Sequence, residues 1–284
     1  MFDSSSTRRG RRSSRERPAD ILDISPQLSE VSSYGGFFAL TVGGDPAGWR
    51  PVTECYADGS ADLIAATARR YRTRDLRIGA SLVHLAHASR LWSPVLGCAI
   101  GHGVVPDLGD LHRAATGAQL RLPEPVGRRV TAPHPELLYR LVVDEHLGPL
   151  AAGLRVGLAP ALLAGNVASA LVGAARALLS ARPDLRSAIV ETTLALLDTG
   201  IMSGAGTVTG PPLDFRRASC CLFYRLPGAR CAATACWIDS TRLRTHHCSR
   251  GTSKSTHNAR QTSRGSTPSS IACAAVRPPK PVST

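Results

Sequence analysis

The chain has 284 residues and a formal net charge of +13, with 43% hydrophobic and 19% charged residues. A chain of this length can form one large domain or two small ones around a substantial core. The charge is concentrated at the two ends: residues 1–20 carry six arginines against three acidic residues, and residues 237–284 carry eight basic residues against one. The central body is nearly balanced, and the basic ends lack the interleaved aromatic residues of nucleic-acid-binding folds, so we expect no nucleic-acid partner.

The N-terminal segment 1–20 is rich in Arg and Ser. It has no apolar stretch after its paired arginines, unlike a secretory signal. We therefore expect a disordered basic leader and a cytoplasmic protein. In the cytoplasm, clustered cysteines are more often metal-binding or redox-active than cross-linked, and this chain has eight cysteines.

Short apolar runs bounded by Gly, Pro and Asp follow the leader, at residues 35–44 and 50–58. These runs predict strands joined by turns. Helical periodicity then begins at Ser60, a candidate N-cap, and continues over residues 60–72 and 77–92.

Two histidines, His84 and His87, lie three residues apart in the second of these helices. This spacing is compatible with a metal site, but no carboxylate or third ligand is nearby in the sequence. We favour the interpretation that they are core or groove-lining histidines.

The middle of the chain mixes extended and helical patterns. Residues 93–108 and 118–126 predict short strands or extended connections, and Cys98 a small buried hydrophobe. Helices are predicted after Pro135, Pro160 and Pro183, the last one closed by Gly200.

One apolar run, residues 156–175, has no charge and is long enough to cross a bilayer. It is rich in Ala and Gly, contains Pro160 and Asn166, and has an arginine on each side. We therefore expect a buried core helix.

These elements predict an α+β fold: a mainly helical body with a few short N-terminal strands and a small C-terminal cysteine-rich segment. We expect the body to span residues 21–210 and the cysteine-rich segment residues 211–236. The tail 237–284 is dense in Ser, Thr, Arg and Pro without an apolar period, and is expected to be disordered.

Four cysteines fall within seventeen positions of the cysteine-rich segment: Cys220, Cys221, Cys231 and Cys236. Four convergent thiolates suit either a tetrahedral zinc ion or an iron-sulfur cluster. Zinc ribbons usually supply two short Cys-x-x-Cys-like hooks, which this spacing lacks. Adjacent cysteines point in different directions, so they fit a two-iron cluster more readily than one small ion.

The surrounding sequence "FRRASCCLFYRLPG", residues 215–228, resembles the C-terminal signature of the ferric siderophore reductases of the FhuF type. In that family a basic pair, a Cys-Cys, an aromatic-Tyr-Arg and a Pro-Gly turn precede a final Gly-Asp-Cys. Residues 80–97 and 165–178 are also similar to the family, and the resemblance extends over about residues 35 to 236.

The resemblance implies a 2Fe-2S cluster held by Cys220, Cys221, Cys231 and Cys236. It implies an oxidoreductase that reduces a ferric siderophore by one electron, releasing Fe(II) for iron assimilation. The electron donor would be a ferredoxin or a flavin/NAD(P)H reductase, and peripheral association with the inner membrane stays open. Arg216, Arg217 and Arg225 would then tune the cluster potential, steer an anionic chelate, or form a solvated rim, and Tyr224 would pack over the cluster.

The second half of the cysteine motif departs from the family pattern, Cys-Cys-x10-Cys-x2-Cys. Cys231 comes one residue early, and Cys236 follows after four residues without a preceding Gly-Asp. Back-translation with GC-rich codons restores a Gly-Asp-Cys ending in another frame, so one hypothesis is that residues 229–284 are a frameshift product. Two alternatives remain open: a zinc-stabilised structural or interaction module, and a degenerate reductase that does not assemble its cluster.

Overall fold

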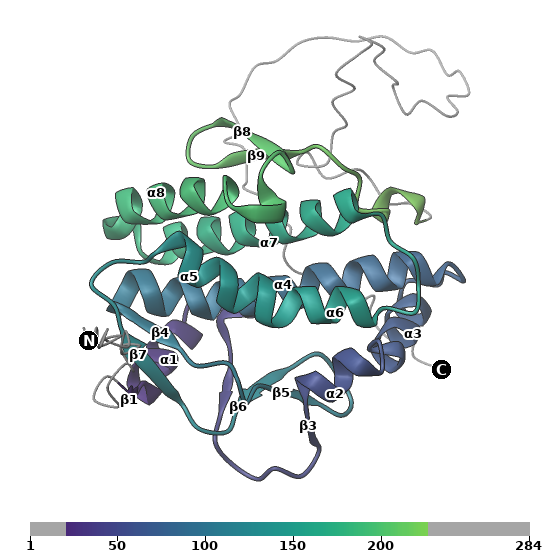
Figure 1. The fold of residues 1–284 in the computed structure, drawn as a ribbon, viewed down its shortest axis with the longest axis horizontal. Helices are drawn as coiled ribbons and strands as arrows, with labels where there is room; N and C mark the ends of the chain where they lie inside the picture. The colour runs from purple at the N-terminus through teal and green to yellow at the C-terminus, as the bar shows by residue number, and fades with distance from the viewer. Residues whose placement is uncertain (1–20, 227–284) are drawn as a thin grey trace, which may run out of the picture.

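The computed structural model describes residues 21–226, which are coloured in Figure 1. Helices dominate this part of the chain and short strands supplement them, which confirms the expected α+β fold with a mainly helical body. Cys231, Cys236, the leader 1–20 and the tail 237–284 lie outside the described residues.

The helices are α1 (Ser25–Ser32), α2 (Val52–Ala57), α3 (Ala61–Arg70), α4 (Leu76–His102), α5 (Pro135–Tyr139), α6 (Gly148–Gly153), α7 (Pro160–Ala181) and α8 (Arg186–Leu197). A π-helix, η3 (Arg140–Leu147), joins α5 to α6. Single 3₁₀ turns are η2 (Gly36–Phe38), η4 (Pro183–Leu185), η5 (Gly200–Met202) and η6 (Phe223–Arg225).

The strands form three small sheets. In the first, β7 (Val126–Arg129) pairs antiparallel with both β1 (Ile21–Asp23) and β4 (Val104–Pro106). The second has the order β2 (Thr41–Val42), β6 (Leu120–Leu122), β5 (His112–Ala114), β3 (Trp49–Pro51), with only the β2–β6 pair parallel. The third is the antiparallel hairpin of β8 (Gly206–Gly210) and β9 (Asp214–Arg217).

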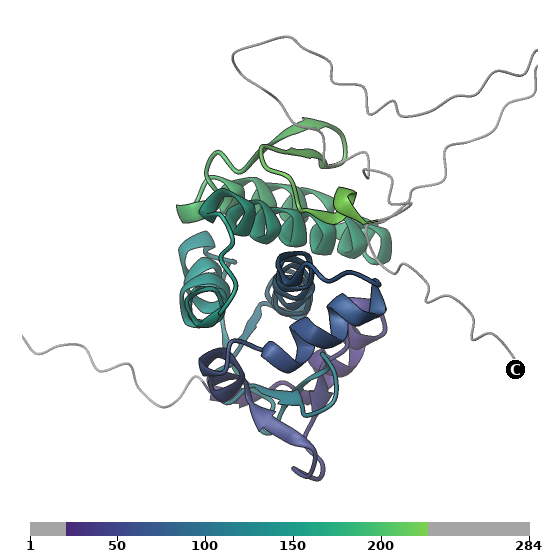
Figure 2. The same cartoon turned by 90° about the vertical axis from the view of Figure 1, so that its right-hand side faces the viewer.

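Helix α4 runs through the centre of the molecule, and Figure 2 shows it end-on between α7 and the lower layer of strands and short helices. Its middle is buried, with Leu91, Trp92, Val95 and Leu96 at most 1% exposed. Burial of such side chains contributes about 1.5–3 kcal/mol each, so α4 organises the main core.

Helix α7 lies along α4 over much of its length, as Figures 1 and 2 both show. Among the described helices it alone is long and apolar enough to cross a membrane, but 67% of its most apolar window is buried within the protein. Its small residues allow close packing against α4, in agreement with the expected core helix.

Three extended segments expected from the sequence are helical in part. Residues 35–44 form the 3₁₀ turn η2 before the short strand β2. Residues 93–102 continue α4 through Pro94, because Val95, Leu96 and Cys98 are fully buried and their packing outweighs the local cost of proline. Gly97 lets α1 approach closely, since a Cβ there would lie 2.7 Å from Val31 Cγ1, and Cys98 is buried as expected.

The strand expected over residues 50–58 covers only β3, and α2 follows at once. Ser60 precedes α3 as expected but does not cap it: its φ is +49°, and its hydroxyl donates to the Cys55 carbonyl at 3.2 Å. Gly200 does not close α8, which ends at Leu197; it begins η5 instead.

The β8–β9 hairpin lies on the outer side of α7 and α8 (Figure 1). Its first strand belongs to the expected body, residues 21–210, and its second strand to the expected cysteine-rich segment, residues 211–236. The two segments are therefore joined by strand pairing. From β9 the chain turns back across α7 toward the N-terminal half of α4.

Candidate functional site

The segment that carries Cys220 and Cys221 follows β9 directly. The Ser81 hydroxyl on α4 donates to the Cys221 carbonyl at 2.9 Å, a contact between residues 140 positions apart. On either side of η6, Leu222 and Leu226 are buried against Ile78 of α4 and Leu162 of α7. The cysteine segment is therefore fixed to both long helices.

A buried arginine anchors this segment at its start. Arg217 is 3% exposed, and its guanidinium donates to Asn166 Oδ1 at 3.0 Å and to the Leu162 carbonyl at 3.1 Å. It also donates to the Ser219 hydroxyl at 3.3 Å, one residue before Cys220. We call Arg217, Asn166 and Ser81 the anchor.

Asn166 connects the two parts of the anchor. Its amide nitrogen donates to the Ser81 carbonyl at 3.0 Å while its oxygen accepts from Arg217, and the side chain is fully buried. Gly165, beside it on α7, provides the space: a Cβ there would lie 2.6 Å from Arg217 Nη2 and closer still to the Ser219 hydroxyl.

The structure thus separates the three arginines noted in the sequence. Arg217 is a buried structural residue and not part of a solvated rim. Arg216 and Arg225 are exposed, and Arg225 Nη1 lies 3.6 Å from Asp75 Oδ2. Tyr224 is 43% exposed, and its hydroxyl accepts from Arg225 Nε at 3.3 Å.

Cys220 and Cys221 lie side by side in the chain, and each is half-buried. Two adjacent thiols held at the surface of a rigid body fit one half of a 2Fe-2S donor set, in which the two sulfurs reach different irons. No three His, Cys, Asp or Glu side chains within residues 21–226 gather around one point. Cys231 and Cys236, the other two ligands expected from the sequence, lie outside the described residues.

An arginine-rich surface flanks the cysteine segment. Five arginines at the α3–α4 junction are exposed: Arg69, Arg70, Arg72, Arg74 and Arg77. Tyr71, in the middle of this run, packs edge-on against Phe223 with ring centroids 6.0 Å apart. The arginine-rich surface is therefore continuous with the turn that follows the cysteines.

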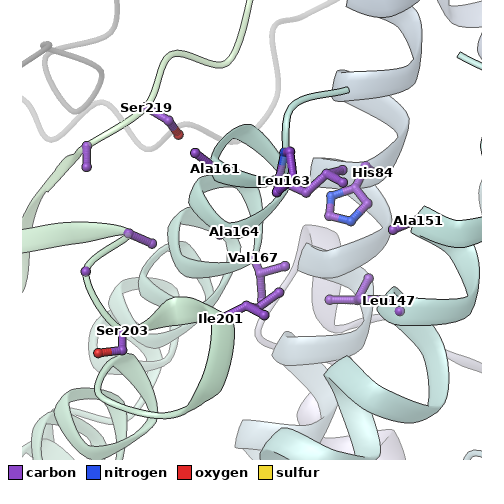
Figure 3. A pocket seen from close by; sticks show the side chains of 15 residues that line it. His84, Leu147, Ala151, Ala161, Leu163, Ala164, Val167, Ile201, Ser203 and Ser219 are labelled. Carbon is purple, nitrogen blue, oxygen red and sulfur yellow. The ribbon is translucent and has the colours of Figure 1, made fainter. Parts of the chain in front are cut away.

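Behind the cysteine segment, a pocket of about 470 Å³ opens between α4, α6, α7 and the η5 loop. Figure 3 shows His84 projecting from α4 toward Leu163 and Ala151, with Leu147 and Val167 on the inner wall. Ser219 lies at the side nearest the cysteines. The lining contains no charged side chain.

His84 is 1% exposed, and its Nδ1 has no hydrogen-bond partner among the described residues. Burial, reinforced by the positive charge of Arg217, lowers the pKa of His84 to about 4. The imidazole is therefore neutral at pH 7, and it lines the pocket, as one of the two interpretations from the sequence expected.

His87 takes part in a second buried polar group. The Tyr56 hydroxyl lies 2.7 Å from His87 Nε2 and 3.1 Å from His146 Nδ1. Burial lowers the pKa of His87 well below its usual value and that of His146 to about 4, and raises the pKa of Tyr56. A hydroxyl carries one proton, so Tyr56 donates to one neutral imidazole and accepts from the other.

Tyr56 and His146 could not be linked to His87 from the sequence, because they lie 31 and 59 residues from it and share no local pattern with it. Comparison of the chain with models of known protein families, with curated proteins and with solved structures gives no match.

Proposed function

We propose that this protein is a 2Fe-2S ferric siderophore reductase. One observation carries the proposal. The upstream stretches that resemble the FhuF-type reductases, residues 80–97 and 165–178, contain Ser81, Gly165 and Asn166. These are the residues that hold the Cys220–Cys221 segment in place. Three separate parts of the resemblance thus meet at one site.

The cluster would be held by Cys220 and Cys221, with Cys231 and Cys236 as the expected remaining ligands. A bound 2Fe-2S cluster supplies a one-electron donor. Ferric iron in a siderophore is a hard, highly charged ion bound by oxygen donors. Adding one electron lowers its charge and weakens the chelate, so iron leaves as Fe(II).

The protein's own residues would position the two thiolates and keep them accessible. The anchor fixes the backbone around Ser219 and Cys221, while both cysteine side chains remain half exposed. Electron transfer to a large chelate needs such a surface position, because a siderophore does not enter a packed core.

The arginine-rich surface favours an electron donor that has an acidic face, such as a ferredoxin. Five exposed cations beside a redox site attract an anionic partner and raise its association rate, an effect that salt screens. In this proposal the five exposed arginines of the arginine-rich surface contribute to docking. Arg225 pairs with Asp75, which lies between Arg74 and Arg77 in the chain, and also interacts electrostatically with Cys220.

The test is the visible absorption and EPR spectrum of the full chain, reconstituted anaerobically with iron and sulfide. We expect a brown protein that bleaches with dithionite, shows an EPR signal when reduced, and reduces a ferric siderophore. Cys220→Ser and Cys231→Ser should remove the signal. Cys98→Ala replaces a buried cysteine near the C-terminal end of α4; it is the matched control and should retain the signal.

Other outcomes separate the alternatives. A colourless chain that binds one zinc ion would contradict the proposal and favour the structural module. A chain that binds neither zinc nor a cluster would correspond to the degenerate reductase. If replacing residues 229–284 with the alternative reading frame restored the cluster, the frameshift hypothesis would be supported.

A further inference from the structure

The pocket behind the cysteine segment is unlike a site for a charged ligand. Its walls are apolar side chains and backbone of α4, α6, α7 and the η5 loop, and no Lys, Arg, Asp or Glu lines it. Burying an ion there would remove its hydration without a counter-ion. The volume of about 470 Å³ is within the range of small-molecule sites.

His84 gives the pocket one strong polar feature. It is nine-tenths buried, neutral at pH 7, and its Nδ1 is unpartnered within residues 21–226. An unpaired buried nitrogen is costly, and a ligand that hydrogen-bonds to it would recover that cost. Ser203 and Ser219 are the other residues of the lining that carry a polar side chain.

We infer that this pocket binds a neutral, largely apolar small molecule whose hydroxyl or carbonyl group hydrogen-bonds to His84. The apolar walls select the body of the molecule, and His84 selects its polar group. Because Ser219 belongs both to the wall and to the anchor, the ligand would lie next to the start of the cysteine segment. The inference goes beyond the proposed reductase activity and does not depend on it.

The probes are three naphthalene compounds that share one ring system: 2-naphthol, naphthalene and 2-naphthoate. Titration calorimetry on the full chain at pH 7.5 measures their affinities. We expect saturable one-to-one binding of 2-naphthol, weaker binding of naphthalene, and at least about tenfold weaker binding of the 2-naphthoate anion.

Variants test whether the ligand binds in this pocket and hydrogen-bonds to His84. His84→Phe keeps an aromatic ring and removes the nitrogen, and should weaken 2-naphthol about three- to tenfold while changing naphthalene less than about twofold. Ala164→Leu fills the pocket from α7 and should weaken both compounds about tenfold or more. His134→Phe, an exposed histidine outside the lining, is the control and should change neither.

Three results would overturn the inference: no saturable binding of 2-naphthol, equal affinity for 2-naphthoate, or unchanged affinity in Ala164→Leu. If His84→Phe does not fold, Ala164→Leu and the three-compound series decide the question. The measurement is made on the chain with or without bound iron. A chain that does not bind 2-naphthol and a chain that does not assemble the cluster are therefore separate results.

Discussion

Replacing Gly165 with alanine tests whether the anchor holds the cysteine segment. Gly165 lies inside α7, where alanine is ordinarily the more stable residue by about 1 kcal/mol. At this position, however, an added Cβ would lie 2.6 Å from Arg217 Nη2 and 2.9 Å from Arg217 Nε. The guanidinium must then move away from α7.

The cost follows from the bonds that Arg217 would lose. Its donations to Asn166 Oδ1 and to the Leu162 carbonyl come from a charged group in a buried site. Hydrogen bonds of this kind contribute about 1.5–3 kcal/mol each. Losing both bonds would cost about 3–6 kcal/mol, against a helix-propensity gain of about 1 kcal/mol, so we expect Gly165→Ala to lower the free energy of unfolding by about 2–5 kcal/mol.

Gly173→Ala is the matched control, because it is in the same helix and a Cβ there meets nothing within 4 Å. It should raise the free energy of unfolding by up to about 1 kcal/mol. Urea titration at pH 7.5 measures both variants. Residue-resolved alkylation should also show faster reaction of Cys220 and Cys221 in Gly165→Ala. If both variants had the same free energy of unfolding and the alkylation rates of Cys220 and Cys221 were unchanged, the anchor would not hold the cysteine segment in place.

Three further predictions concern buried histidines and surface charge. The folded-state pKa values of His84 and His146 are about 4 and the unfolded value is about 6.5, so below pH 6.5 the folded protein binds fewer protons than the unfolded chain. The free energy of unfolding should therefore be constant above pH 6.5 and fall toward pH 4, by about 1.4 kcal/mol per pH unit for each histidine. A urea-unfolding profile that is flat from pH 7 to 5 would contradict this. Tyr56→Phe removes the partner of two buried imidazole nitrogens and should cost about 2–4 kcal/mol by the same assay, whereas a cost below about 1 kcal/mol would contradict the contact. Arg74→Glu should slow reduction of the cluster by an acidic ferredoxin severalfold at low salt and much less at high salt. The control Arg186→Glu, on α8, should not change the rate. Equal effects of these two charge-reversal variants would exclude the arginine-rich surface as the docking site.

Local sequence pattern was sufficient to predict the long periodic helices. It failed where tertiary packing overrode a local signal. Pro94 and Gly97 suggested an extended segment, yet the buried side chains around them keep α4 helical to His102. The six residues of α2 are too few to show a helical period, so they were interpreted as a strand.

The candidate site, too, was predicted from the sequence only in part. Cys220 and Cys221 were found from spacing, because adjacent cysteines are rare enough to stand out. The residues that hold them were not, since Ser81, Asn166 and Arg217 are single polar residues, 85 positions apart between Ser81 and Asn166 and 51 between Asn166 and Arg217. Asn166 did interrupt an otherwise apolar run, and that interruption was the available signal for a buried polar contact.

The use of a charged residue in the anchor has a physical consequence. A buried arginine is seldom more stabilising than an apolar side chain of similar size, because desolvation offsets most of its interactions. Its advantage is direction: Arg217 donates to the Leu162 carbonyl and to Asn166 on α7 and also to the Ser219 hydroxyl, so it sets the position of the start of the segment relative to α7. Apolar contacts, such as those of Leu222 and Leu226, hold the segment down but permit it to slide. Fixed direction matters most where two adjacent thiolates must each reach a different iron of one cluster, as the proposed 2Fe-2S centre would require.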